Sequence, residues 1–125
     1  MELTDKCKVV FEKWYFKNHC KSSMKFEELL PHHKQDVFGW FYNIDLSFRY
    51  AVYIDFFDSV GIHISDMVNC YHSSKNKPTF STSGFSVCVE GNGFCHDLDD
   101  FKTRPEARTE AIKKANEIYN KLLDN

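Results

Sequence analysis

The chain has 125 residues, of which 42% are hydrophobic, 16% aromatic and 27% charged. This composition excludes a disordered tail and predicts one globular domain over residues 1–125, with room for a single core. The formal net charge is −2, from 16 Lys and Arg against 18 Asp and Glu, so the basic excess typical of duplex nucleic-acid binding is absent.

The cysteines and the hydropathy pattern predict the compartment. Five cysteines form no paired-spacing pattern, which favours free thiols in a reducing environment over a disulfide framework. Residues 1–6 lack the apolar core of a signal peptide, and no hydrophobic run approaches the length of a membrane span. We therefore expect a cytoplasmic protein with no membrane partner.

Residues 1–45 are expected to form a helical, aromatic-rich extension. A helix should begin at Thr4, a good capping residue, and end near Asn18, because apolar residues recur at helical spacing in between. A short helical turn is expected over 26–30. The crowded aromatic residues of 31–45 leave the secondary structure of that segment open, with a helix slightly favoured.

Residues 46–125 predict a core of one helix, three strands and a second helix. The apolar period changes from helical to alternating at Gly61, and Gly91-Asn92-Gly93 is a hairpin signal because these residues tolerate positive φ. The expected elements are a helix over 46–60, strands over 62–67, 85–90 and 94–101, and a helix over 103–122.

The last helix is the most strongly marked element. Thr103 and Glu106 form a capping-box motif at its start. Ala107, Ala111 and Ala115 then make a stripe of small residues that allows close approach to a sheet. The predicted fold class is α+β: an N-terminal helical segment, then α-β-β-β-α with a three-stranded antiparallel sheet packed on helices.

The polar segment 71–84 predicts a long connection between the first two strands. Its length is uncommon for an idle connection, and long loops on rigid scaffolds often carry recognition. On this hypothesis a recognition edge would be exposed there. Its residues are Tyr71, His72, Lys75 and Lys77. The plain alternative is a connection without a partner.

Several islands of sequence resemble a known group. They are residues 3–6 (LTDK), 11–14 (FEKW), 55–62 (DFFDSVGI), 103–112 (TRPEARTEAI) and 115–120 (ANEIYN). Together they resemble small uncharacterised proteins of Bacteroides-type phages and mobile elements. The resemblance implies a phage or prophage origin, and therefore the cytoplasm of a bacterial host, and supplies no activity or catalytic residue.

The order α-β-β-β-α is also similar to that of the double-stranded-RNA-binding domain. In that family a Lys-rich start of the last helix grips phosphates. Here the corresponding residues, 103–108, keep Arg104 and Arg108 but include Glu106, and three aspartates lie just upstream. The family's glycine-rich approach to this helix is missing. The resemblance therefore implies the topology more than the RNA-binding function.

Cysteine and histidine lie close together in three places, residues 19–20, 70–72 and 95–96, beside a His32-His33 dyad. A zinc site needs four convergent ligands, and no Cys-x-x-Cys is present. Adjacent residues of a strand point to opposite faces, so Cys95 and His96 cannot share a site. We therefore expect no metal and no cofactor.

Catalytic chemistry has equally little support. Cys88 or Cys95 could pair with a histidine, but no nucleophile signature surrounds either thiol. Asp55 and Asp58 lie one helical turn apart, which also suits a solvated helix face. No glycine-rich phosphate loop is present. We expect no catalytic residues and no enzymatic activity.

The aromatic surplus is the remaining functional signal. Twelve Phe, six Tyr and two Trp exceed what a small domain readily buries, and aromatic anchors characterise protein contact surfaces. Phe56 adjoins Phe57, and Phe16 adjoins Tyr15, so one ring of each pair should face outward. Phe16, Trp40 and Phe56 complete the predicted partner-binding set.

Two functions follow as hypotheses. The first is a non-enzymatic, phage-derived module that binds another protein or a second copy of itself, with host machinery or defence as a plausible target. The alternative is a single-stranded or double-stranded nucleic-acid-binding domain. Aromatic rings on the sheet face with Lys75, Lys77 and Lys102 could stack bases, although the overall charge disfavours this partner.

Overall fold

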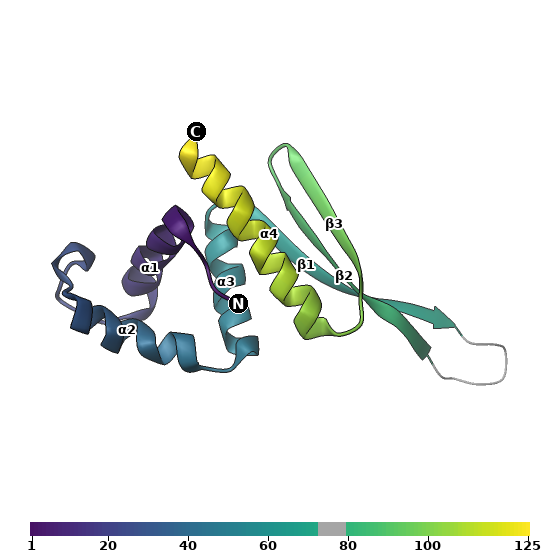
Figure 1. Cartoon of the computed structure of the whole chain (residues 1–125), viewed down its shortest axis with the longest axis horizontal. Coiled ribbons are helices and arrows are strands. Elements are labelled where there is room, and N and C mark those ends of the chain that lie inside the picture. The colour runs from purple at the N-terminus through teal and green to yellow at the C-terminus, as the bar shows by residue number, and fades with distance from the viewer. Residues whose placement is uncertain (73–79) are drawn as a thin grey trace.

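A computed structural model describes residues 1–72 and 80–125, and the side chains of 1–68 and 84–125. Its α+β architecture confirms the predicted fold class, with helices preceding and following a three-stranded sheet (Figure 1). The elements are α1 (Asp5–His19), a 3-10 turn η1 (Phe26–Glu28), α2 (Pro31–Asn43), α3 (Leu46–Ser59), β1 (Ile62–His72), β2 (Phe80–Gly91), β3 (Phe94–Phe101) and α4 (Arg104–Asp124).

The sheet has the order β1-β2-β3, and both neighbouring pairs are antiparallel. The predicted hairpin turn is confirmed, because Gly91 pairs with Phe94 and Gly93 has φ +86°. A φ in this region costs glycine little and other residues more, which explains the residue type at the turn.

The first two strands are longer than the sequence predicts. Pairing continues to His72 opposite Phe80, although the whole of 71–84 was expected to be a connection. β3 pairs with β2 only from Phe85 onward, so the far part of the β1–β2 hairpin extends beyond the third strand (Figure 1). Serine and threonine there lack the apolar alternation used to predict strands, but backbone pairing does not require it.

The ambiguous segment 31–45 is largely a helix, the slightly favoured alternative. Pro31 occupies the first turn of α2, where the missing N–H costs nothing. Phe38 and Phe41, one helical turn apart, are buried in the core. The aromatic residues of α2 therefore lie on two faces: Phe38 and Phe41 are buried, and Trp40 is exposed.

α4 packs against one face of the sheet. Ala107, Ala111 and Ala115 are fully buried there, as the small-residue stripe predicted. Thr103 Oγ1 accepts a hydrogen bond from the Glu106 amide at 3.3 Å, which confirms the Thr103 half of the predicted capping box. The opposite face of the sheet carries no helix in the described structure, and β3 alternates between half-buried and exposed side chains along its length.

Aromatic rings join the N-terminal helices to the rest of the protein. Phe11 of α1 is fully buried, with its ring centroid 5.3 Å from Phe41, 5.1 Å from Tyr53 and 5.3 Å from Phe56. One hydrophobic cluster therefore includes residues from 1–45 as well as from the α-β-β-β-α part. Aromatic rings at these distances and in tilted or edge-to-face orientations attract each other, in addition to the gain from burying apolar area.

A polar clamp fixes the start of α1 to α4. Thr4 precedes α1 as predicted, but its hydroxyl makes no capping bond to its own helix. Instead Asn116 accepts from the Thr4 amide at 3.0 Å and donates to Thr4 Oγ1 at 2.9 Å. Asn120 Oδ1 accepts from the Cys7 amide at 2.8 Å. Side chains from α4 thus accept hydrogen bonds from backbone N–H groups at the start of α1, which have no partner within their own helix.

Candidate functional site

A short connection between α2 and α3 positions the site. Only Ile44 and Asp45 separate the two helices. Asp45 Oδ1 accepts a hydrogen bond from the Ser47 amide at 2.8 Å and so caps α3. The tight turn brings Trp40, near the end of α2, and Phe48, in the first turn of α3, to the same groove.

The groove between these helices is apolar and has a volume of about 510 Å³. Trp40 and Phe48 are the two most exposed large hydrophobic side chains in the described structure, at 67% and 69% exposed. Nine residues line it: Tyr15, His19, Trp40, Phe41, Ile44, Asp45, Phe48, Ala51 and Val52. We call this feature the Trp40–Phe48 groove.

Buried rings form the base of the Trp40–Phe48 groove. Phe41 is fully buried, and its ring centroid lies 5.0 Å from that of Tyr15. The His19 ring stacks on Tyr15 at 5.1 Å with an interplanar angle of 20°. Burial is the main cause that raises the pKa of Tyr15, so its hydroxyl stays protonated at neutral pH. These contacts fix the base of the groove before any partner arrives.

One carboxylate lies in the lining of the groove, and two more lie one helical turn from lining residues. Asp45 lines it directly. Asp36 lies one helical turn before Trp40 on α2, and Asp55 lies one turn after Ala51 on α3, so each shares a face with a groove residue. All three carboxylates are exposed. The apolar hollow therefore has one carboxylate in its lining and two on helix faces shared with its lining residues.

Two of the predicted partner-binding rings are in the core, which corrects the expectation that they face outward. Phe56 is fully buried because α3 is covered by α1 and α4 as well as β1, and its ring lies 5.6 Å from Trp14 and 5.9 Å from Tyr119. Phe16 is 7% exposed because residues around η1 fold back over it, with Phe26 at 6.2 Å.

The other predicted partner-binding residues have different outcomes. Trp40 is exposed, as a binding residue must be. Tyr71 and His72 lie at the end of β1, and nothing is described of their side chains. Lys75 and Lys77 lie outside the described residues. Sequence reasoning missed Phe48, although its position outside the apolar stripe of 46–60 was a signal of exposure.

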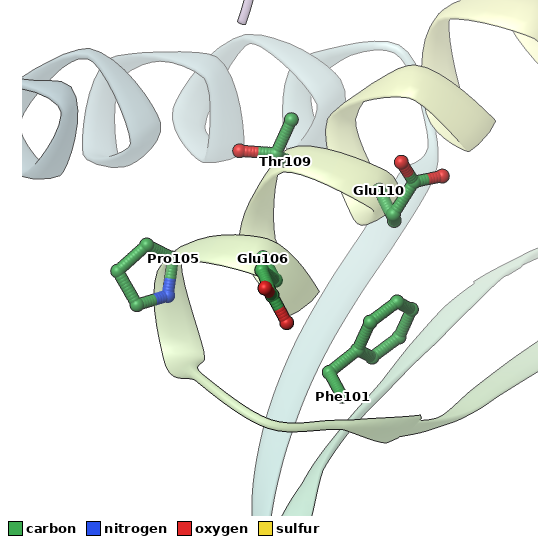
Figure 2. Close-up of a pocket in the computed structure, with 5 residues that line it drawn as sticks. All are labelled: Phe101, Pro105, Glu106, Thr109 and Glu110. Atoms are coloured by element: carbon green, nitrogen blue, oxygen red, sulfur yellow. The ribbon is translucent and has the colours of Figure 1, made fainter.

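The start of α4, where the RNA-binding resemblance places phosphate contacts, is acidic on the side facing Phe101. Figure 2 shows Glu106 and Glu110 of α4 beside Phe101 of β3, in a hollow of about 480 Å³ that Pro105 and Thr109 also line. Carboxylates at this position repel a phosphate backbone.

The two arginines of this region are engaged with the protein itself. Arg104 Nε and Arg108 Nε each lie 3.6 Å from the same Asp66 carboxylate oxygen. The Arg108 guanidinium also lies 4.7 Å from the centre of the Tyr50 ring. These contacts hold both guanidinium groups toward the sheet and α3.

The open face of the sheet carries polar side chains and thiols. In its described part, the exposed residues of β1 and β3 on this face include Ser65, Cys95 and Asp97, and no aromatic ring is among the exposed side chains of the sheet. Among the residues whose side chains are described, the expected exposed aromatic rings are therefore not found on the sheet face.

Two of the four cysteines with described side chains, Cys7 and Cys88, have strongly raised pKa values. Cys7 is fully buried, and burial raises its pKa to about 12. Cys88 lies on the open face, where desolvation and hydrogen bonds to Cys95 and Asp97 raise its pKa to about 12. Both thiols are therefore protonated at neutral pH, which does not favour an activated nucleophile.

Comparisons with known proteins identify no family: no family model matches the chain, and no curated protein or solved structure matches it significantly. Among the described residues, no helix is both long enough and apolar enough to cross a membrane. The assignment of function therefore rests on the geometry of the molecule.

Proposed function

We propose that this protein is a non-enzymatic protein-binding module that uses the Trp40–Phe48 groove. The observation that carries the proposal is the exposure of two large rings, at 67% and 69%, beside an apolar hollow with a buried aromatic base. Large exposed rings around a pocket are typical of the anchors that dominate binding energy at protein interfaces.

The shape and charge of the groove favour one kind of partner. An apolar hollow between two helices suits an amphipathic segment that inserts one or two apolar side chains. The carboxylate of Asp45 in the lining, with Asp36 and Asp55 one helical turn from Trp40 and Ala51, favours lysine or arginine on the flanks of that segment. The partner we propose is therefore a protein segment with apolar anchors and basic flanks, and self-association is the competing arrangement.

The resemblance to phage and mobile-element proteins extends the proposal to a biological setting. A small phage-encoded module without catalytic residues would act by occupying a surface of a host protein. We therefore propose host machinery, including a defence complex, as the source of the basic-flanked segment. This step rests on the resemblance of the sequence islands and on no residue of the groove.

Nucleic-acid binding is the alternative, and the charge distribution argues against it. Glu106 and Glu110 occupy the start of α4, while Arg104 and Arg108 contact Asp66. Fluorescence anisotropy against labelled single-stranded and duplex oligonucleotides across a salt series tests this alternative. Binding at low salt that weakens steeply as salt rises would support it over the protein-binding proposal.

A pair of matched variants tests the proposal. Trp40→Ala with Phe48→Ala removes both anchors, and Leu122→Ala removes a 50% exposed apolar side chain from α4 as the control. Affinity capture from a host lysate, with light scattering on the eluted complex, should show a partner retained by wild type and Leu122→Ala but lost by the double variant. Equal retention by all three proteins would contradict the proposal, as would a strictly monomeric wild type that retains no partner.

A further inference from the structure

Two thiols meet on the open face of the sheet, far along the chain from the groove residues. In the β2–β3 hairpin Cys88 pairs with Asp97 and Glu90 pairs with Cys95, so the cysteines are diagonal neighbours on one face. Their sulfur atoms lie 3.5 Å apart. The tight turn after Gly91 fixes this register, so the contact follows from the hairpin itself.

The sulfur separation suits a shared metal ion better than a disulfide. A tetrahedral zinc ion with Zn–S bonds of about 2.3 Å holds its two sulfurs about 3.8 Å apart. A disulfide needs sulfurs about 2.05 Å apart and Cα atoms within about 7 Å. Diagonal neighbours in an antiparallel pair have Cα atoms about 7 to 8 Å apart, so a disulfide here would require the backbone to move.

Carboxylates complete a ligand set around the two thiols. A carboxylate oxygen of Glu90 and the sulfurs of Cys88 and Cys95 all lie within 4.8 Å of one another. Asp97, directly opposite Cys88 in the register, adds a second carboxylate on the same face. Thiolate and carboxylate are both zinc ligands, and three protein ligands leave a fourth position for Asp97 or water.

We propose that Cys88, Glu90 and Cys95 form a binding site for a thiophilic divalent cation of the zinc type. The ligands come from both arms of the β2–β3 hairpin, so the bound ion would cross-link the two strands beside their turn. Each thiol loses a proton to solvent when it becomes a ligand. The site is chemically separate from the apolar Trp40–Phe48 groove.

The site is accessible to an ion from solvent. Cys95 is exposed and Cys88 half-buried, and Glu90 is exposed at the end of β2. No helix covers this face of the sheet in the described structure. An ion can therefore enter without opening the core, and serine at either cysteine leaves the packing against α4 unchanged.

The test uses the full chain, reduced with a phosphine and titrated with Cd²⁺ as a spectroscopic probe. Thiolate-to-cadmium charge transfer absorbs in the ultraviolet at shorter wavelength than the aromatic side chains, so wild type should show one saturable band that added Zn²⁺ competes away. Cys88→Ser with Cys95→Ser should abolish the band, and Glu90→Gln should weaken binding at least about tenfold, because losing even a group that only supports a metal ligand costs that much. Cys20→Ser, at a half-buried cysteine on another part of the chain, is the matched control.

Two outcomes would overturn the proposal. One is a wild-type protein that binds neither Cd²⁺ nor Zn²⁺. Formation of a Cys88–Cys95 disulfide after removal of the phosphine, without ion binding, counts as the same result. The other is equal binding by wild type and the double serine variant, which would place the ion elsewhere. Far-ultraviolet circular dichroism of each variant verifies that it folds, and Glu90→Gln tests the site with both thiols intact.

Discussion

Replacing Phe56 with alanine should destabilise the protein severely, while the same change at Phe48, on the same helix, should not. Phe56 is fully buried, and its ring centroid lies 5.3 Å from Phe11 and 5.6 Å from Trp14. Truncation would remove these contacts and leave a cavity between three helices. Such core changes cost about 3 to 5 kcal/mol of unfolding free energy, a large part of the stability of a domain this size.

Phe48 is 69% exposed, so Phe48→Ala should change the unfolding free energy by no more than about 0.5 kcal/mol. Urea unfolding of wild type and both variants, followed by circular dichroism, measures the difference directly. A Phe56→Ala loss below about 1 kcal/mol, or a Phe48→Ala loss as large as that of Phe56→Ala, would refute the division into core rings and binding rings.

Three further changes test other parts of the structure. Asn116→Ala removes two hydrogen bonds to Thr4 and should lower the free energy of unfolding, measured in urea, by about 2 kcal/mol. Glu117→Ala, at the adjacent exposed position, should change it very little. Equal effects of the two changes would contradict the polar clamp. Gly93→Ala forces a side chain into φ +86° and should cost about 1 kcal/mol in the same assay, and no loss would argue against the turn geometry. Burial raises the pKa of Glu12 above its ordinary 4.5, so ionisation of this carboxyl disfavours the folded state. Glu12→Gln should therefore increase the free energy of unfolding at pH 7, and the increase should vanish below pH 4.5, where Glu12 is protonated in both states. An increase that persists in acid would contradict an effect of Glu12 ionisation.

The fold was predictable because local signals and long-range packing agree over most of the chain. Three local sequence patterns each predict a single structure, and the structure confirms all three. They are the alanine stripe of α4, the Thr103 cap at its start and the Gly91–Gly93 turn. The polar end of the β1–β2 hairpin was not predictable, because its strands are defined by backbone pairing and not by apolar alternation. The use of Thr4 depends on Asn116, more than a hundred residues away.

The candidate site was only partly predictable, because exposure of a ring depends on how many elements cover its helix. Trp40 and Phe56 both belong to aromatic-rich helices, yet one is 67% exposed and the other fully buried. α3 contacts α1, α4 and β1, so neither Phe56 nor Phe57 is left outside the core. Sequence spacing alone does not contain that information.

The meeting of Cys88 and Cys95 was available from the sequence. Once a two-residue turn follows Gly91, the register places both thiols on one face of the hairpin. Cys95 also lies next to His96 in the sequence, and that proximity draws attention away from the cysteine pair.

The most direct test of the protein-binding account uses Trp40 as its own reporter. Trp14→Phe leaves Trp40 as the single tryptophan, 67% exposed at the edge of the groove. Its emission is recorded while the variant is titrated with an amphipathic leucine-rich peptide carrying lysine flanks, and with the same peptide carrying glutamate flanks. The account predicts a saturable blue shift with the lysine peptide that weakens with salt, and weaker binding of the glutamate peptide. An emission unchanged by both peptides, or shifted equally by both, would contradict it.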